Sequence, residues 1–149
     1  MAFEAAKTAD LDGVRALLRA VHLPDQDVDE ALLADFLVLR SNGALVAVGA
    51  LMSLDERTGL VRSIAVDPAL QGDGLGSRVL RALEERAASG ALESLFLLTT
   101  TAPGFFSARG YEEVFREDAP TAVRTTTQFA ELCPTSAIVM RKRLSTGRT

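Results

Sequence analysis

The spacing of apolar residues in the first third of the chain predicts one short strand and two helices. FEAAKT has the composition of a short first strand. Beyond it, apolar residues recur every three or four positions, which predicts a helix with Thr8 as its N-cap. These apolar positions are Leu11, Val14, Leu17, Leu18 and Val21. The stretch HLPDQDVDEALL then contains a Pro-Asp turn and predicts a second short helix.

Three apolar runs in the middle of the chain predict an antiparallel meander. DFLVLR and ALVAVGALM flank Ser41-Asn42-Gly43, and Asn-Gly between two apolar runs is a good hairpin signal. A second turn, DERTG, returns the chain into LVRSIAV. Two hairpins in succession imply three neighbouring antiparallel strands.

The pattern after LVRSIAV predicts a strand–helix–strand crossover. QGDGLG leads into SRVLRALEERA, a helix that ends at Ser89-Gly90, and SLFLLTT then predicts a buried strand. The helix positions expected to face inward are Leu75, Val79, Leu80, Leu83 and Ala87. Two strands joined in this way should be parallel, with a right-handed connection.

The remaining segments complete one sheet. APGFFSARG predicts a short helix ended by Gly110, and YEEVFRE and SAIVMRKRL predict the last two strands. We therefore predict an α/β fold with a central mixed sheet, mostly antiparallel with one parallel pair, flanked by helices. No linker, repeat or low-complexity segment divides residues 1–149, so we expect a single domain.

Composition narrows the classes of function. The 149 residues are 48% hydrophobic and 24% charged, which is typical of a soluble globular domain. A net charge of -4 without a basic stripe argues against nucleic-acid and membrane partners. The only cysteine, Cys133, rules out an intramolecular disulfide and a cysteine-built zinc site, so no metal is expected. MAFEAAKTAD lacks signal-peptide features and no apolar run could span a bilayer, so we expect a cytoplasmic location.

QGDGLG places three glycines at alternate positions where a helix begins, although glycine weakens helices. One explanation is a phosphate site, in which bare backbone turns its N–H groups toward an anion at the helix N-terminus. The alternative is a tight turn or close helix–strand packing, and the spacing alone favours neither. A P-loop is excluded because Ser77-Arg78 follows Gly76, and the dinucleotide fingerprint is excluded because Ser77 stands where its last glycine belongs.

In its context this stretch resembles the acetyl-CoA motif of the GCN5-related N-acetyltransferase (GNAT) superfamily. The pattern Gln71-x-x-Gly74-x-Gly76 follows a strand ending in AVDP and precedes an amphipathic helix and an apolar strand. GFFSARGYEEV resembles the second signature of that family, a short helix and a Gly-aromatic pair before the next strand. The resemblance is firm from about Leu60 to Val114, and the order of elements extends it over nearly the whole chain. It implies the GNAT fold.

The resemblance also implies the co-substrate and its site. In the family, the strands that correspond to LVRSIAV and SLFLLTT splay apart around the pantetheine arm of acetyl-CoA, and the glycine loop holds the pyrophosphate. Asp73 departs from the basic residue common at its position, so only its backbone N–H is expected to bind. The expected CoA contacts are Ile64, Ala65, Val66, Gln71, Gly72, Asp73, Gly74, Leu75, Gly76, Ser77 and Phe105.

The acid and base usual in that family are missing. LVRSIAV carries no carboxylate, so Asp55-Glu56 in the preceding turn are the candidate base through water, with a solvated turn as the more common role. Phe106 replaces the usual tyrosine acid, and Tyr111 matches a structural aromatic expected in the core. We assign the catalytic hydroxyls to Thr100 and Ser107, with protonation by water or an unassisted thiolate as alternatives.

The expected acceptor side combines Arg62 with the carboxyl-terminal stretch. An arginine inside an apolar strand is costly unless it is paired with an anion. Arg62 is therefore expected to bind either the carboxylate of the acceptor or a carboxylate of a neighbouring residue, and the sequence favours neither. FAELCPTSA and LLTTTAPGFFSARGY resemble the arsenic-resistance-associated subgroup and, more distantly, glutamate N-acetyltransferases. This resemblance implies acceptor contacts from Arg124, Thr126, Cys133 and Ser136, and Thr101, at the end of the strand near the expected gap, joins Arg62 as a further candidate. For Cys133 a core position is the alternative we favour, and for His22 a surface position.

The sequence thus predicts an acetyl-CoA-dependent N-acetyltransferase that acts on the amine of a small, carboxylate-bearing molecule, such as an amino acid or an arsenic-related analogue. The alternatives are acetylation of a peptide or protein amine, and a CoA-binding sensor without catalysis. Homodimerisation is common in the family that the chain resembles and is expected on that ground alone.

Overall fold

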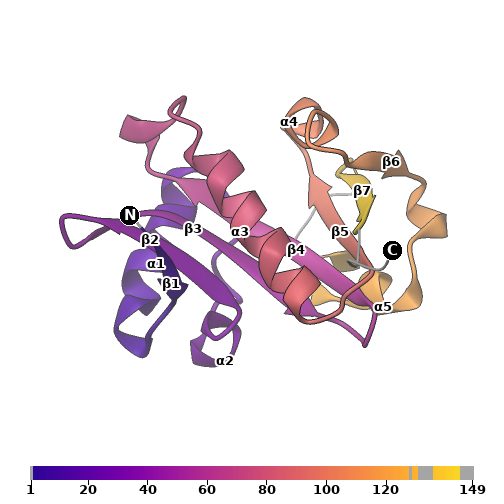
Figure 1. Ribbon diagram of the computed structural model, residues 1–149, viewed down its shortest axis with the longest axis horizontal. Coiled ribbons are helices and arrows are strands. Elements are labelled where there is room, and N and C mark those ends of the chain that lie inside the picture. Colours follow the sequence, from indigo (N-terminus) through magenta and orange to yellow (C-terminus); the bar gives the residue numbers. More distant parts are fainter. Residues whose placement is uncertain (1, 128, 131–135, 145–149) are drawn as a thin grey trace. The chain divides into compact units, whose positions relative to one another are not determined.

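The computed structural model describes residues 2–127, 129–130 and 136–144 and contains one seven-stranded sheet (Figure 1). The strand order is β1-β2-β3-β4-β5-β7-β6. Among the pairs with a described register, β4 with β5 is parallel and the others are antiparallel. The predicted α/β class, a mixed sheet with one parallel pair and flanking helices, is confirmed. The chain divides into two compact units, Met1–Leu51 with Val61–Arg86 (unit 1) and Met52–Leu60 with Ala87–Thr149 (unit 2).

The first elements form a meander with three helices. The strands are β1 (Phe3–Ala5), β2 (Phe36–Ser41), β3 (Ala44–Ser53) and β4 (Thr58–Val66), and the helices are α1 (Leu11–Ala20), α2 (Glu30–Leu33) and α3 (Leu75–Ser89). At the first hairpin Asn42 and Gly43 both have positive φ, 53° and 83°, as the predicted Asn-Gly turn requires. At the second, Asp55 Oδ1 accepts the N–H groups of Arg57 and Thr58. Both predicted hairpins are confirmed.

The start of the first helix differs from the prediction. Thr8 does not cap α1, because Thr8–Asp10 form a 3-10 turn (η1) whose N-cap is Lys7. The buried carboxylate of Asp10 accepts the Lys7 N–H at 2.8 Å and a hydrogen bond from Arg40 on β2 at 2.7 Å. The Arg40 hydrogen bond, the largest cause, lowers the pKa of Asp10. A contact between residues 30 positions apart therefore decides where this helix begins.

The two faces of the sheet in unit 1 pack against different helices. Phe36, Val38, Val48 and Ala50 join the buried residues of α1 and α2 in one core cluster. Gly49 points the other way, since a Cβ built on it would lie 2.5 Å from Val79 Cγ1 of α3. The predicted inward positions of α3 are all buried. Alternation along β3 thus sends successive residues to α1 and to α3, with Gly49 allowing α3 to approach closely.

Unit 2 contains the parallel step and the end of the sheet. Its elements include β5 (Ser94–Thr99), α4 (Pro103–Ser107), β6 (Glu112–Val114), a 3-10 turn η3 (Arg116–Asp118), α5 (Thr121–Arg124) and β7 (Ile138–Arg143). Thr58 to Leu60 of β4 pair in parallel with Ser94 to Phe96. The last strand, β7, lies between β5 and β6 and is antiparallel to both. The strand expected from YEEVFRE is confirmed only over Glu112–Val114, because Phe115, 72% exposed, turns the chain into η3.

None of the helices in the described part of the chain is long and apolar enough to cross a membrane.

Candidate cofactor-binding site

The chain between β4 and α3 is shaped by short-range hydrogen bonds. Asp67 N–H donates to Val46 O at 2.9 Å, which fixes the end of β4 beside β3. Asp67 Oδ1 then accepts the N–H of Ala69 at 2.9 Å and caps a 3-10 turn, η2 (Pro68–Leu70). Gln71 Nε2 donates to Val66 O at 3.4 Å, so its side chain folds back on the strand. These bonds set the direction in which the glycine stretch leaves the sheet.

Two of the three glycines are required by their backbone conformation. Gly72 and Gly74 have φ of 95° and 80°, in the left-handed region that favours glycine. A Cβ on either would meet no atom within 4 Å, so close helix–strand packing does not explain them. Gly76 instead lies in the first turn of α3. The glycines therefore serve a turn that leaves the backbone bare and exposed at residues 72–74.

The first turn of α3 presents donors beside this bare backbone. The first intrahelical bond runs from Arg78 N–H to Gly74 O at 3.2 Å. The N–H groups of Leu75 and Gly76 precede it and so have no acceptor within the helix. Together with the partial positive charge of a helix N-terminus, they suit a phosphate. Leu75 itself is buried, so its side chain holds the helix on the core while its backbone faces the loop.

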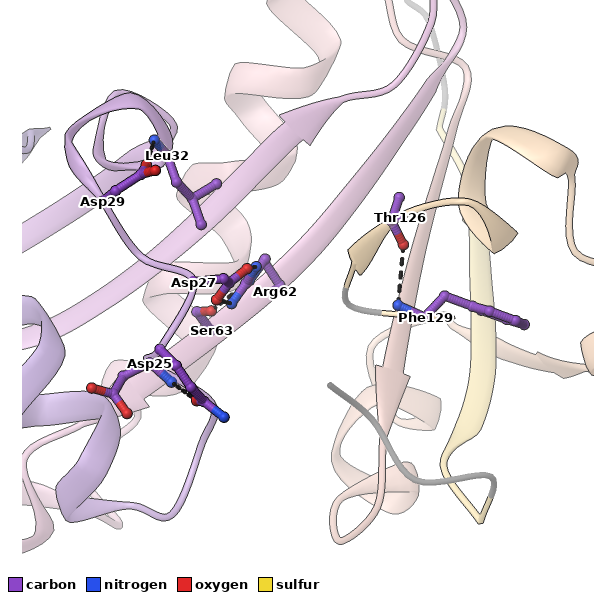
Figure 2. A network of polar contacts seen from close by, with 9 residues as sticks. Asp25, Asp27, Asp29, Leu32, Arg62, Ser63, Thr126 and Phe129 are labelled. Atoms are coloured by element: carbon purple, nitrogen blue, oxygen red, sulfur yellow. Dashed lines mark hydrogen bonds and ion pairs between the residues drawn. The ribbon is translucent and has the colours of Figure 1, made fainter. Parts of the chain in front are cut away.

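The middle of β4 carries a buried ion pair and an unusual backbone. Arg62 is 4% exposed, and its two terminal nitrogens donate to the carboxylate of Asp27 at 2.5 and 2.9 Å (Figure 2). Arg62 Nε donates to Ser63 Oγ at 2.9 Å. Ser63 has φ of 62°, rare for a residue other than glycine and rarer inside a strand. Of the two roles predicted for Arg62, the structure shows the pairing with a neighbouring carboxylate, and a contact with an acceptor stays a prediction.

Asp27 belongs to the segment between α1 and α2, residues 21–29. Asp25 anchors this segment to α1 by accepting from Arg19 at 2.8 Å and from Arg15 at 3.4 Å. The hydrogen bond from Arg19 is the main cause that lowers the pKa of Asp25. Asp29 caps α2 by accepting the Leu32 N–H at 2.9 Å (Figure 2). His22, in the same segment, is exposed, as expected.

In unit 2 the short helix α4 carries an aromatic cluster. The rings of Phe105 and Phe106 meet edge to face, with 5.0 Å between centroids, and Phe106 meets Tyr111 at 5.8 Å. Tyr111 is 3% exposed, so the prediction of a core aromatic is confirmed. The guanidinium of Arg109 lies 3.8 Å from the Phe105 centroid and donates to Phe105 O at 2.8 Å. Phe106 therefore fills a packed position in place of the tyrosine acid.

Of the predicted catalytic hydroxyl residues, Thr100 directly follows β5 and Ser107 is the last residue of α4. Thr100, Thr101 and Ser107 are exposed. Their neighbour Thr99 is buried and uses its Oγ1 to accept the Ala102 N–H at 3.0 Å. Hydrogen bonds from the backbone, first that of Arg57, lower the pKa of the candidate base Asp55. A carboxylate that already accepts two backbone N–H groups serves the turn and is a weak base.

The carboxyl-terminal residues predicted to face an acceptor differ in their surroundings. Arg124 and Ser136 are exposed, and Arg124 makes a long contact of 3.5 Å with Thr121 Oγ1. Thr126 instead holds a turn, donating to Val123 O at 2.7 Å and accepting the Phe129 N–H at 3.1 Å (Figure 2). Cys133 lies outside the described residues.

The structure brings part of the predicted site together within unit 1. Ile64 to Val66 and Gln71 to Ser77 form one continuous strand end, loop and helix start, and Arg62 lies two residues before them. Thr100, Phe105 and Arg124 belong to unit 2. Sequence reasoning missed Asp27 and the conformation of Ser63. The signal for Asp27 was the acidic stretch DQDVDE, which supplies the carboxylate that a buried arginine needs.

Comparison with known proteins relates the chain to acetyltransferases. An amino-acid acetyltransferase of Pseudomonas fluorescens (strain Pf0-1) is 31% identical over 130 residues, which cover 80% of this chain and 30% of that protein. The chain thus spans less than a third of the length of the curated relatives it matches. The N-acetylglutamate synthase of Neisseria gonorrhoeae, solved with coenzyme A and N-acetyl-glutamate, superposes with a TM-score of 0.85 at 22% identity, covering 97% of this chain and 35% of that one.

A second solved structure has the length of this chain. Rv2747 from Mycobacterium tuberculosis, in complex with CoA, superposes with a TM-score of 0.83 at 22% identity and covers 97% of this chain and 100% of its own. Both superpositions show a shared fold. Residues 12–115 match the acetyltransferase (GNAT) family, which is more than two thirds of the sequence. The chain therefore belongs to the acetyltransferase (GNAT) family, a family of acyltransferase enzymes.

Proposed function

We propose that this protein transfers an acetyl group from acetyl-CoA to the amine of a small, carboxylate-bearing molecule such as an amino acid. The observation that carries the proposal is the exposed turn at Gly72 and Gly74, directly before the first turn of α3, in a chain of the GNAT family. The backbone N–H groups of a turn with positive-φ glycines, and those of a helix N-terminus without an acceptor in the helix, are the donors that a pyrophosphate needs. Two proteins with similar folds were solved with CoA, which supports the same co-substrate here.

The chemistry requires a free amine and a reactive thioester. The amine nitrogen bonds to the acetyl carbon, the carbon–sulfur bond breaks, and the amine loses a proton while the CoA thiolate gains one. Backbone groups of Ile64 to Val66 would hold the pantetheine arm, and the turn at 72–74 with the start of α3 would hold the pyrophosphate. Thr100 and Ser107 are the candidate hydroxyl donors toward the leaving thiolate. Orientation of the two substrates supplies much of the rate in such a reaction.

The class of acceptor is proposed from the relatives and from one arginine side chain, that of Arg124. Several curated relatives are amino-acid acetyltransferases, and the Neisseria enzyme was solved with N-acetyl-glutamate. An α-amino acid carries a carboxylate that an arginine binds through paired hydrogen bonds. Arg124 is exposed, and within the described part of the chain its guanidinium makes a long contact with Thr121 of its own helix, so it suits this role. Thr101 and Ser136, also exposed, are proposed as neighbouring polar contacts.

A second candidate function is CoA binding without turnover. It is favoured by Phe106, which cannot donate a proton, and by a β4 strand without a carboxylate. A thiol-release assay with acetyl-CoA, over amino acids, polyamines, peptide amines and arsenical amino-acid analogues, separates the two. The expected result is release of CoA from acetyl-CoA that depends on the presence of a small amino acid. Binding of acetyl-CoA without release of CoA in the presence of any amine would favour the second function. No binding of acetyl-CoA at all would contradict both functions.

Replacing Asp73 by lysine should tighten CoA binding. The side chain of Asp73 is exposed in the turn that we assign to the pyrophosphate, so its negative charge opposes the ligand. Two charges a few ångströms apart in water interact by about 1 kcal/mol. The substitution removes a repulsion and adds an attraction of this size, so we expect a tightening of about 30-fold at low salt. Isothermal titration calorimetry with CoA at two ionic strengths measures it. The gain should shrink at high salt, and equal affinities for Asp73→Lys and the parent would place the phosphates elsewhere.

Replacing Arg124 by alanine should weaken use of the acceptor without affecting CoA. Losing a charge-assisted pair of hydrogen bonds lowers kcat/KM for the amino acid about 10- to 100-fold. Arg57→Ala is the matched control, because it removes the same charge from a well-exposed side chain whose Nε lies 3.8 Å from Glu93 Oε2. If Arg124→Ala and Arg57→Ala leave kcat/KM equally unchanged, the acceptor carboxylate does not bind at Arg124.

A further inference from the structure

The buried pair Asp27–Arg62 joins two parts of unit 1 that are far apart in the sequence. Arg62 lies inside β4 with its side chain 2% exposed, and Asp27, 21% exposed, lies 35 residues earlier in the segment between α1 and α2. The guanidinium contacts both carboxylate oxygens, the paired geometry that fixes orientation as well as distance (Figure 2). Asp27 therefore holds segment 21–29 against the middle of β4.

The same guanidinium also contacts the one residue of β4 with positive φ. Arg62 Nε donates to Ser63 Oγ, and Ser63 is itself buried with φ of 62°. A non-glycine residue in this region is strained and persists only where its surroundings hold it. Asp27 orients Arg62, and Arg62 holds the side chain of Ser63. The backbone that follows, Ile64 to Val66, leaves the strained residue in a direction set by this chain of contacts.

Stability alone is a poor reason for such a pair. Removing two charges from water costs about as much as their attraction returns, and apolar residues of similar size commonly replace buried pairs without loss. Strained backbone in proteins clusters where a ligand or a reacting group must be positioned. Here the strain lies directly before the strand end that the proposed function assigns to the pantetheine arm.

We propose that Asp27 and Arg62 are positioning residues, which hold the backbone at Ser63 to Val66 in the conformation needed for acetyl transfer and fix segment 21–29 beside it. This inference rests on the proposed function. Neither residue needs to touch a reacting atom. The pair acts through Ser63, so its loss should change how productively acetyl-CoA is held more than whether it binds, because the pyrophosphate contacts lie further along the chain.

The test compares Asp27→Asn with Asp29→Asn. Both remove one negative charge from segment 21–29, but Asp29 caps α2 and asparagine caps a helix as well as aspartate does. We expect Asp27→Asn to lower kcat about 10- to 100-fold, as misplacement of a reacting group does. Its CoA dissociation constant, measured by calorimetry, should change less than about threefold, because the proposed pyrophosphate contacts stay in place. Asp29→Asn should match the parent in both.

Amide hydrogen exchange makes the test independent of catalysis. In Asp27→Asn the amides of Ile64, Ala65 and Val66 should exchange at least about tenfold faster than in Asp29→Asn, because the held strand opens locally. The double variant Asp27→Leu, Arg62→Met should keep the parent's melting temperature and still show fast exchange and low kcat. If it keeps both the melting temperature and parental kcat, or if Asp27→Asn matches Asp29→Asn in exchange, the positioning role is wrong. If the parent binds no CoA, the proposed function fails, while the exchange comparison still decides whether the pair holds β4.

Discussion

Replacing Gly74 by valine should abolish CoA binding while leaving the protein folded. Gly74 has φ of 80°, a conformation that a β-branched residue adopts only with strain of about 1–2 kcal/mol. Valine therefore favours another φ, which turns the N–H groups of the loop and of the first turn of α3 away from a common point. Losing two hydrogen bonds to a charged group weakens affinity by about 100-fold or more.

Gly43→Val is the matched control for this change. Gly43 has φ of 83° and, like Gly74, no atom within 4 Å of a built Cβ, but it lies in the hairpin between β2 and β3. Both variants should therefore lose similar stability in thermal melts. Calorimetric titration with CoA should show loss of binding for Gly74→Val and parental binding for Gly43→Val. Equal CoA affinities in the two variants would mean that the pyrophosphate does not bind at this turn.

Replacing Gly49 by alanine should destabilise the fold substantially. The added Cβ would lie 2.5 Å from Val79 Cγ1 and 3.1 Å from Leu83 Cδ1, and both side chains are fully buried in α3. Valine on a helix has one strongly preferred rotamer, so α3 itself must move away from β3. Overpacking of this kind costs about 1–3 kcal/mol, which lowers the melting temperature of a domain of this size by about 2–12 °C.

The destabilisation should depend on Val79. Adding Val79→Ala to Gly49→Ala removes the clashing methyl groups, so the two changes together should cost less than the sum of their separate costs. Gly104→Ala serves as the control, since a Cβ there meets nothing within 4 Å and alanine favours the helix α4. That variant should melt at or slightly above the parental temperature. Additive costs for Gly49→Ala and Val79→Ala would contradict the close approach of α3 to β3.

What the sequence predicted correctly depends on neighbours along the chain. The turn at Asn42-Gly43 follows from residues that tolerate positive φ, and the inward face of α3 follows from the helical period. The glycine turn before α3 could be predicted in the same way, because the positive φ of Gly72 and Gly74 is a conformation that glycine itself favours.

What the sequence did not predict depends on residues that meet only after folding. Thr8 was a reasonable N-cap by residue type, but the carboxylate of Asp10, held by Arg40, moved the start of the helical segment to Lys7. The place of β7 between β5 and β6 follows from long-range pairing that apolar runs do not encode. The alternatives for Arg62 stayed equal for the same reason, since its partner Asp27 is 35 residues away.

The aromatic cluster at α4 also gives the protein a built-in optical probe. The chain has no tryptophan and one tyrosine, so Tyr111 is its only strong ultraviolet fluorophore. Tyr111 is buried beside Phe106 in unit 2, so its emission responds to the packing of that unit. Far-ultraviolet circular dichroism is sensitive to the helices of both units, including α1 and α3. Melting curves recorded by both signals on one unlabelled sample would therefore reveal whether the two units unfold in a single cooperative step.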